Sequence, residues 1–382
     1  MPEMTAETVL SNARIVLADE IVEGSLVLRG GFIADVDAGS SPTGEDMGGD
    51  YVIPGLVELH TDHLEGHYAP RPKVRWNPIA AVLAHDAQVA TAGITTVLDA
   101  LRVGMDEDAD LTLADIRKLA DAIEDSVAQD RLRADHFLHL RCEVSAPDCL
   151  QAFANFDGDE RVKLASLMDH APGQRQFVNL ETYAYYYQRK LKLTDRDFKL
   201  FCEKRMGESA LNSRPNRVHI AAACQERGIV LASHDDATIG HVGEAIEQGV
   251  RVAEFPTTQE AARASKEAGL GVLMGAPNVM RGASHSGNVS ARTLASDGLL
   301  DILSSDYIPF SLIQSAFFLG DVVEGISLPQ AVAMVSKNPA EAVGLNDRGI
   351  IEQGRRADLV RVRVDDHVPV VRTVWRQGLR VA

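Results

Sequence analysis

Eight short apolar runs constrain the fold of this chain more than any other feature. They lie near residues 52–60, 94–100, 136–143, 162–169, 229–234, 250–255, 271–276 and 300–305. Most are separated by helix-like stretches such as LADIRKLADAIEDSVAQD, and near-continuous hydrophobicity is typical of parallel strands buried on both faces. Eight such units predict an α/β fold of the (β/α)8 barrel type, which takes about 250 residues. A doubly wound sheet has the same local pattern and is the structural alternative.

The two ends of the chain have a different pattern, in which branched apolar residues alternate with Gly, Asn and Asp turns. Residues 8–37 have the character of β-hairpins, as do ADLVRVRV and VPVVRTVWRQGLRVA near the C-terminus. Neither end has enough strands to bury a core alone. We therefore predict a small β-sandwich domain from 1–51 and 352–382, a barrel over 52–351, and a helical insertion near 181–228.

The composition excludes several classes of protein. No run of eighteen apolar residues is present, and the N-terminus lacks a signal-peptide pattern. The formal net charge of −17 would repel nucleic acid and anionic membranes, so neither is an expected partner. The four scattered cysteines argue against a disulfide framework or a thiolate zinc site. We expect a cytoplasmic protein; the oligomeric state is left open, with a homodimer as one expectation.

Five predicted strands end in a histidine or an acid, in ELHTDH, HLRCE, SLMDH, LASHDD and LSSD. The C-terminal ends of barrel strands meet at one mouth, and alternation along a strand puts His60 and Asp62 on one face. Imidazoles and carboxylates together suit Zn²⁺, Mn²⁺ or Fe²⁺ rather than Ca²⁺. We predict a divalent transition metal site of one or two ions, with ligands His60, Asp62, Glu143, His170, His234 and Asp306.

Asp306 has a second predicted role, because it follows the last strand. It is the candidate catalytic residue, which would take a proton from water bound to the metal. The alternative is an aspartate that only caps the following loop.

Two loops have features of an anion site. Residues 275–291, GAPNVMRGASHSGNVSA, place polar side chains among glycines, which let backbone N–H groups approach an anion. Residues 69–76, APRPKVRW, form a proline-stiffened basic loop. Each arginine taken singly is as well explained by a surface salt bridge, but together they indicate an anionic substrate. The predicted substrate-binding residues are Arg71, Lys73, Arg141, Arg175, Arg281, Ser284, His285 and Asn288.

These motifs resemble the amidohydrolase superfamily. The likeness rests on PGLVELHTD after an N-terminal β segment, the later strand-end histidines, SSD, and the closing NPAEAVGLNDRGIIEQGRRADLVRV. The usual His-x-His is here His60-x-Asp62. With ELHTDHLEGHYAPRPKVRW, HLRCEVS, MDHAPGQRQF, ASHDDAT and SSDYIP, this departure resembles one subfamily, the PhnM-type α-D-ribose 1-methylphosphonate 5-triphosphate diphosphatases of phosphonate breakdown.

The resemblance implies a reaction ahead of the carbon–phosphorus lyase, on a phosphorylated ribose. A metal-bound hydroxide would attack the α-phosphoryl group of the 5-triphosphate, release diphosphate and leave ribose 1-methylphosphonate 5-phosphate. One alternative is a metal-dependent amidohydrolase or deaminase that acts on a cyclic amide or a nucleobase-like substrate, which the two candidate anion-binding loops disfavour. A second is an inactive barrel that serves as a scaffold, which the complete set of candidate ligands disfavours.

Overall fold

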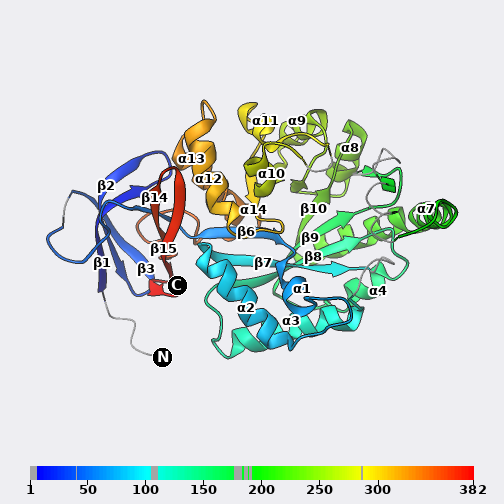
Figure 1. The fold of residues 1–382 in the computed structure, drawn as a ribbon, viewed down its shortest axis with the longest axis horizontal. Coiled ribbons are helices and arrows are strands. Elements are labelled where there is room, and N and C mark those ends of the chain that lie inside the picture. Colours follow the sequence, from blue (N-terminus) through cyan, green and yellow to red (C-terminus); the bar gives the residue numbers. More distant parts are fainter. Residues whose placement is uncertain are drawn as a thin grey trace.

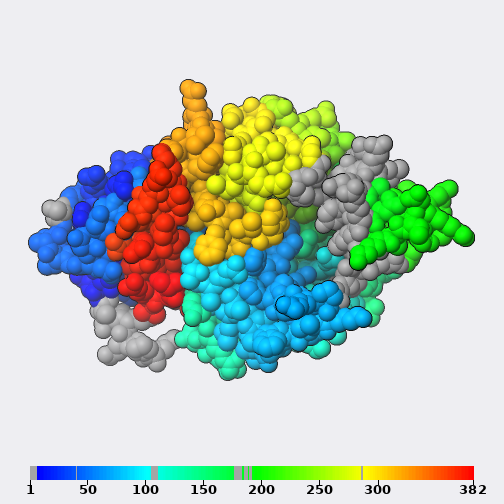
Figure 2. Space-filling model, viewed as in Figure 1, coloured from blue at the N-terminus to red at the C-terminus, as the bar shows by residue number. Residues whose placement is uncertain are grey.

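The computed structural model describes residues 7–39, 41–104, 111–175, 183–184, 188, 192–284 and 287–382. It contains two eight-stranded β-sheets, one from the two chain ends and one from the middle of the chain. The sheet of the chain ends lies at one end of the elongated molecule, and the long helix α7 (Asp195–Arg227) lies at the other (Figure 1). Figure 2 shows N-terminal and C-terminal segments packed together at the same end.

The second sheet is a barrel of parallel strands that follow one another in chain order. The strands are β6 (Leu56–Thr61), β7 (Ile94–Val103), β8 (Asp135–Glu143), β9 (Val162–Met168), β10 (Val230–His234), β11 (Val252–Glu254), β12 (Gly271–Gly275) and β13 (Ile302–Ser304). Each strand overlaps one of the eight apolar runs. The predicted (β/α)8 barrel is therefore confirmed, and the doubly wound sheet is wrong.

Side chains alternate between the barrel interior and the surrounding helices. Leu164 and Val252 belong to a buried cluster drawn from strands around the whole barrel, so they fill its interior. On β8 the apolar residues at alternate positions pack outward with helix residues. His139, Arg141 and Glu143, which lie between and beyond them, consequently face the interior and the mouth.

The barrel closes between β13 and β6 through a short set of contacts. Thr61 and Asp306 form a single parallel bridge, and the Asp306 N–H donates to the His60 carbonyl at 3.1 Å. The buried carboxylate of Glu58 accepts the N–H groups of His60 and Ser305, each at 2.6 Å. Burial raises the pKa of Glu58 to about 7. This closure brings Asp306 beside the residues that follow β6.

Helices follow the strands and cover the barrel (Figure 1). They are α1 (His63–Tyr68), α2 (Pro78–Thr91), α3 (Leu113–Ala128), α4 (Cys149–Ala154), α7, α8 (Ile239–Glu247), α9 (Gln259–Glu267), α10 (Ala276–Arg281), α11 (Ala291–Ser296), α12 (Ser311–Val322), α13 (Leu328–Ala333) and α14 (Lys337–Ala342). The 33-residue α7 falls inside the predicted insertion. Among the described helices, none combines the length and the hydrophobicity that a membrane crossing requires.

The sheet of the chain ends has the strand order β16-β15-β14-β5-β1-β2-β3, with β4 beside β1. Its strands are β1 (Glu7–Val16), β2 (Ile21–Arg29), β3 (Phe32–Ala38), β4 (Glu45–Asp46), β5 (Tyr51–Pro54), β14 (Leu359–Asp365), β15 (Val368–Arg376) and β16 (Leu379–Arg380). Ile33 and Trp375, from strands near opposite edges, share one buried cluster. The predicted sandwich is thus one sheet that curves around a single core.

The chain passes from this sheet into the barrel at Gly55. β5 lies inside the predicted barrel strand 52–60, yet it pairs antiparallel with β14 and parallel with β1. Residues 52–54 therefore belong to the small sheet, which corrects the predicted start of the barrel. The apolar run continues across the junction because residues on both sides of Gly55 are buried. Ile53 and Leu56 share one cluster, Val52 belongs to the core of the small sheet, and Val57 belongs to the barrel interior. We propose Gly55 as the domain boundary.

Gly55 leaves no room for a side chain. A Cβ at this position would lie 2.2 Å from Thr95 Oγ1 and 3.0 Å from the Asp358 Cβ. Since both neighbours are buried, we expect Gly55→Ala to lower the free energy of unfolding by about 1–3 kcal/mol in denaturant titrations. In α7 a Cβ on Gly207 meets open space, so Gly207→Ala is the matched control and should be neutral or stabilising. Equal destabilisation by both changes would contradict the packing argument.

Candidate metal centre at the barrel mouth

Three imidazoles from separate strand ends meet at the barrel mouth. His60 belongs to β6, His170 follows β9, and His234 ends β10. The His60 and His234 rings are stacked with centroids 5.7 Å apart, and the His170 ring lies 5.6 Å from that of His234. His60 and His234 are buried, whereas His170 is partly exposed. The structure thus brings together three of the predicted metal ligands.

Each of these imidazoles has its Nδ1 atom against a buried carboxylate. Glu254 of β11 lies 3.2 Å from Nδ1 of both His60 and His234, one contact to each carboxylate oxygen. Glu143 lies 2.6 Å from Nδ1 of His170. A carboxylate can only accept here, so the proton resides on Nδ1 and the Nε2 lone pair is left for another partner. Carboxylates orient metal-binding histidines in this way.

The Nε2 atoms face two further carboxylates. Nε2 of His60 lies 3.8 Å from Asp62, and Nε2 of His234 and His170 lie 3.4 Å and 3.7 Å from Oδ2 of Asp235. That Asp235 oxygen is buried and has no hydrogen-bond partner among the described residues. The ligating atoms of His170, His234 and Asp235 all lie within 4.8 Å of one another. Two imidazole nitrogens beside an unsatisfied carboxylate oxygen fit a divalent transition metal.

A proton competes with a metal at His170. Despite burial, the carboxylates of Glu143 and Asp235 raise the pKa of His170 to about 10. The same pairing lowers the pKa of Glu143 to about 2 against the opposing effect of burial. A metal at Nε2 would replace the proton on that atom, so its binding would release a proton at neutral pH. Glu143, predicted as a ligand, contacts Nδ1 of the histidine and is better placed to orient it.

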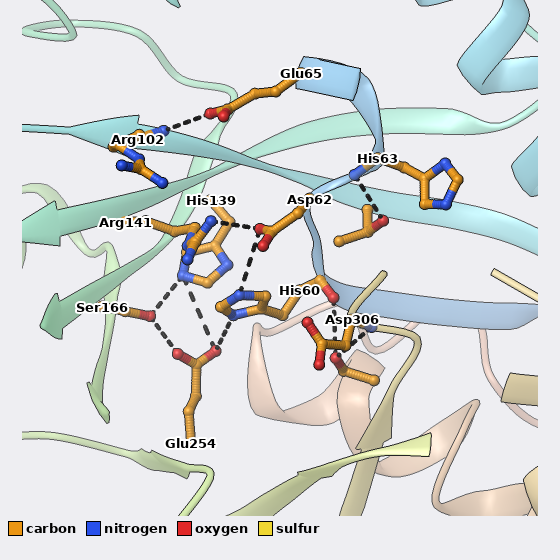
Figure 3. Close-up of polar contacts among 12 residues, drawn as sticks. His60, Asp62, His63, Glu65, Arg102, His139, Arg141, Ser166, Glu254 and Asp306 are labelled. Atoms are coloured by element: carbon orange, nitrogen blue, oxygen red, sulfur yellow. Dashed lines mark hydrogen bonds and ion pairs between the residues drawn. The ribbon is translucent and has the colours of Figure 1, made fainter. Parts of the chain in front are cut away.

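Two acids beside His60, Asp62 and Asp306, have opposite electrostatic surroundings (Figure 3). The Arg141 guanidinium contacts Asp62 and, although burial acts against it, lowers the pKa of that carboxyl. Burial and the adjacent charge of Asp62 raise the pKa of Asp306. A raised pKa makes the Asp306 carboxylate the more basic of the two, as a proton acceptor requires.

A second group of ligating atoms lies deeper in the barrel. The atoms of His60, His139 and Glu254 are also within 4.8 Å of one another. His139 donates from Nδ1 to the Leu59 carbonyl at 2.9 Å, and its Nε2 lies 2.5 Å from the Ser166 hydroxyl (Figure 3). Burial lowers the pKa of His139 to about 3, so this imidazole is neutral. It can therefore accept a hydrogen bond or bind a metal, but it carries no charge.

Among the predicted substrate-binding residues, Arg141 contacts Asp62 at the mouth, whereas Arg175 has other carboxylate partners. Arg175 is buried, and its guanidinium pairs with Asp236 and Glu244. Two carboxylates offset the charge of this guanidinium, and a contact between Arg175 and a phosphate stays a prediction. Arg71 and Lys73 are exposed on the loop between α1 and α2.

The remaining predicted contacts belong to the loop after β12. Arg281 is exposed at the end of α10, and Ser284 and Asn288 are partly buried on the segment that follows. His285 lies outside the described residues. Gly282 has a φ of 78°, the left-handed conformation that glycine adopts without strain, and it ends α10 so that the loop can turn.

Three residues of the centre were not predicted. Glu254 and Asp235 obey the strand-end rule that identified the others, since Glu254 ends β11 and Asp235 directly follows β10. His139 occurs two residues before Arg141 and four before Glu143, so the alternation of β8 places it on the same inward face. The signal was thus present in the sequence for all three.

The geometry is accompanied by a match to a known family. A model described as "Amidohydrolase family" matches residues 165–382, and the chain belongs to that family. Alpha-D-ribose 1-methylphosphonate 5-triphosphate diphosphatase of Escherichia coli (strain K12) is 49% identical over 377 residues, covering 98% of this chain and 100% of that protein. The resemblance noted from the motifs is therefore confirmed.

More distant relatives share the architecture. Imidazolonepropionase of Deinococcus deserti is 25% identical over 395 residues and covers 94% of this chain and 92% of that protein. The solved structure of N-acetyl-D-glucosamine-6-phosphate deacetylase from Mycobacterium smegmatis superposes with a TM-score of 0.65 at 17% identity, covering 98% of this chain and 99% of the other. The likeness to this solved structure supports the fold alone.

The carboxylate of Glu143 contacts Nδ1 of His170. We therefore expect it to strengthen metal binding indirectly, by orienting the imidazole. We expect Glu143→Gln to weaken Zn²⁺ binding by about 10–100-fold, because loss of an orienting carboxylate typically has that effect. Competition with a chromophoric chelator measures the affinity, and circular dichroism checks the fold. The exposed Glu160→Gln is the control. Equal affinities of the two variants would show that Glu143 does not orient a ligand.

Proposed function

We propose that this protein hydrolyses α-D-ribose 1-methylphosphonate 5-triphosphate to α-D-ribose 1-methylphosphonate 5-phosphate and diphosphate, as a step in phosphonate catabolism. The observation that carries the proposal is the 49% identity to the E. coli enzyme of that name, over 98% of this chain. The mouth supports it, since a strand-end metal centre with adjacent guanidinium groups suits a phosphoryl substrate.

The metal would be held on the Nε2 side of the imidazoles. The proposed ligands are drawn from His60, Asp62, His170, His234, Asp235 and Asp306, with Glu143 and Glu254 orienting the imidazoles. These imidazole and carboxylate donors accept Zn²⁺, Mn²⁺ or Fe²⁺, in one or two ions. When bound, such a metal lowers the pKa of water to about 7 and offsets charge on phosphoryl oxygens.

Attack at the α-phosphorus accounts for the products. The oxygen of water forms a bond to the α-phosphorus, and the bond from that phosphorus to the bridging oxygen of the β-phosphoryl group breaks. Asp306 accepts a proton from the water, and diphosphate leaves with the bridging oxygen. The raised pKa of Asp306 makes it suitable for this transfer.

The aspartate at 62 helps to bring positive charge to the mouth. Asp62 contacts Arg141, whereas a second histidine at that position would offer no anion to the guanidinium. Arg102 of β7 lies on the same side, where its backbone N–H donates to Glu65 at 3.3 Å (Figure 3). We propose that Arg141 and Arg102 face the triphosphate near the centre, and that Arg71, Lys73, Arg281, Ser284, His285 and Asn288 contact its outer groups.

The position of bond cleavage provides a direct test. Metal-loaded protein is incubated with the triphosphate in ¹⁸O-labelled water, and products are followed by ³¹P NMR and mass spectrometry. We expect diphosphate, with the label in the ribose 5-phosphate product, because water attacks the α-phosphorus. Label in the diphosphate would place the attack at the β-phosphorus. Ammonia release from cyclic amides, with the triphosphate untouched, would favour the amidohydrolase alternative.

The role of Asp306 can be separated from folding and metal binding. We expect Asp306→Asn to retain the fold and much of the metal, yet to lower turnover by roughly 10²-fold or more, because the amide cannot accept the proton. Steady-state kinetics and metal content measure the two effects. Near-normal turnover would show that Asp306 does not accept the proton.

The cytoplasmic location and the homodimer remain predictions from sequence.

A further inference from the structure

A separate histidine cluster lies beside the mouth, outside the barrel wall. His63 and His67 stand four residues apart on α1, on the same helix face. His85 of α2 faces them, with ring centroids 6.4 Å from His63 and 6.1 Å from His67. One nitrogen from each ring lies within 4.8 Å of the other two.

The hydrogen bonds of the three rings leave the same atom available on each. Nε2 of His63 lies 2.8 Å from the Tyr307 carbonyl, Nε2 of His67 lies 3.0 Å from the Gln88 side-chain oxygen, and Nε2 of His85 lies 2.8 Å from Asp99. Each partner atom is an acceptor, so each Nε2 carries the proton. The three Nδ1 atoms therefore carry lone pairs, and no described residue donates a hydrogen bond to them.

One ring nitrogen of His85 is buried without a hydrogen-bond partner among the described residues. This nitrogen is Nδ1, and the whole ring is buried. Buried polar atoms without a partner are uncommon, since an unpaired group costs free energy. The ring cannot turn to relieve this, because Asp99 holds its Nε2 and also accepts from His136 at 2.8 Å.

The neighbouring group of His85, Asp99 and His136 has a different character. His136 has both nitrogens against carboxylates, at 2.8 Å from Asp99 and 3.4 Å from Asp86. These carboxylates raise the pKa of the buried His136 to about 9. That group is charge-paired without a cation, so Asp99 serves as the fixed support of His85 rather than as a ligand.

We propose that His63, His67 and His85 form a second metal site, distinct from the barrel-mouth centre, which binds Zn²⁺ or a similar divalent transition metal through three Nδ1 atoms. Zn–N bonds of about 2.0–2.1 Å in a tetrahedral site put ligand nitrogens about 3.3 Å apart. Rotation of the two partly exposed α1 side chains would bring the nitrogens, one of which on each ring already lies within 4.8 Å of the others, to this spacing around the fixed His85. Water would complete the coordination. The support of His85 by Asp99 is the carboxylate–histidine arrangement of zinc sites.

The site would join α1 to α2. These helices flank the basic loop with Arg71 and Lys73, and α1 begins directly after Asp62. A metal at this position would therefore hold the start of that loop against the barrel wall. The proposal does not depend on the proposed reaction, because no residue of the mouth centre is a ligand here.

The full-length protein, stripped by chelation, is re-equilibrated with a zinc buffer that holds free Zn²⁺ in the micromolar range. Zinc per chain is measured by mass spectrometry, and crystals from the same buffer give anomalous difference maps at the zinc edge. We expect a peak among the three rings in the wild type. His67→Gln should lose that peak and about one zinc per chain while retaining any peak at the mouth. His367→Gln, which changes an exposed histidine of the small sheet, should keep both.

Each other outcome counts against the site. An ordered water without anomalous signal among the rings, or equal zinc content in wild type and His67→Gln, would overturn it, as would a peak present only at millimolar zinc. If His67→Gln does not fold, His67→Leu and the zinc dependence of the wild-type melting temperature replace it. Failure of the proposed reaction is distinguishable, since an absent mouth peak would leave this peak in place.

Discussion

The buried carboxylate of Glu254 is the interaction on which the mouth depends. It lies inside the barrel and meets the Nδ1 atoms of His60 and His234 and the hydroxyl of Ser166, at 3.2, 3.2 and 2.6 Å. Those partners come from β6, β10 and β9, so one charge sets the orientation of side chains across the barrel. Burial disfavours the charge, but the electrostatic effect of His60 and the hydrogen bonds from His60 and His234 hold the pKa of Glu254 well below its ordinary value. A buried anion with these partners turns the Nε2 atoms toward the mouth.

The same physical arrangement recurs at two other places. Glu143 supports His170 at the mouth, and Asp99 supports His85 outside the barrel. In each case the carboxylate takes the N–H of one ring nitrogen and leaves the other nitrogen basic. The groups around the second nitrogen then decide whether that nitrogen carries a proton. His136 and His170 each lie between two carboxylates, which raise the pKa of the imidazole. His85 has one carboxylate, and its other nitrogen has no hydrogen-bond partner among the described residues.

The aspartate at position 62 determines the charges around the histidines of the mouth. In the usual His-x-His pattern both positions would supply imidazoles, and the mouth would carry less negative charge. Here Asp62 draws Arg141 into the mouth, and Asp306, held beside them by the closing bridge to Thr61, becomes more basic. Asp62 thus holds a guanidinium beside the histidines and helps to raise the pKa of Asp306. In the proposed reaction, these two groups would contact the phosphoryl group and accept a proton.

The sequence by itself determined the barrel and much of the centre. Parallel strands buried on both faces must be apolar throughout, so the eight runs could be located, and the polar residues at their ends identified His60, His170 and His234. The tertiary structure decided what depends on distant partners. Arg175 pairs with Asp236 and Glu244, 61 and 69 residues away. No local sequence pattern distinguishes an arginine with such partners from one that is available to bind a phosphate. Likewise the run through Gly55 is apolar on both sides, and only strand pairing divides it between two sheets. Hydrophobic periodicity depends on neighbouring residues and can therefore be found in the sequence. The partner of a charged side chain or of a strand can lie far away along the chain, so only the tertiary structure shows it.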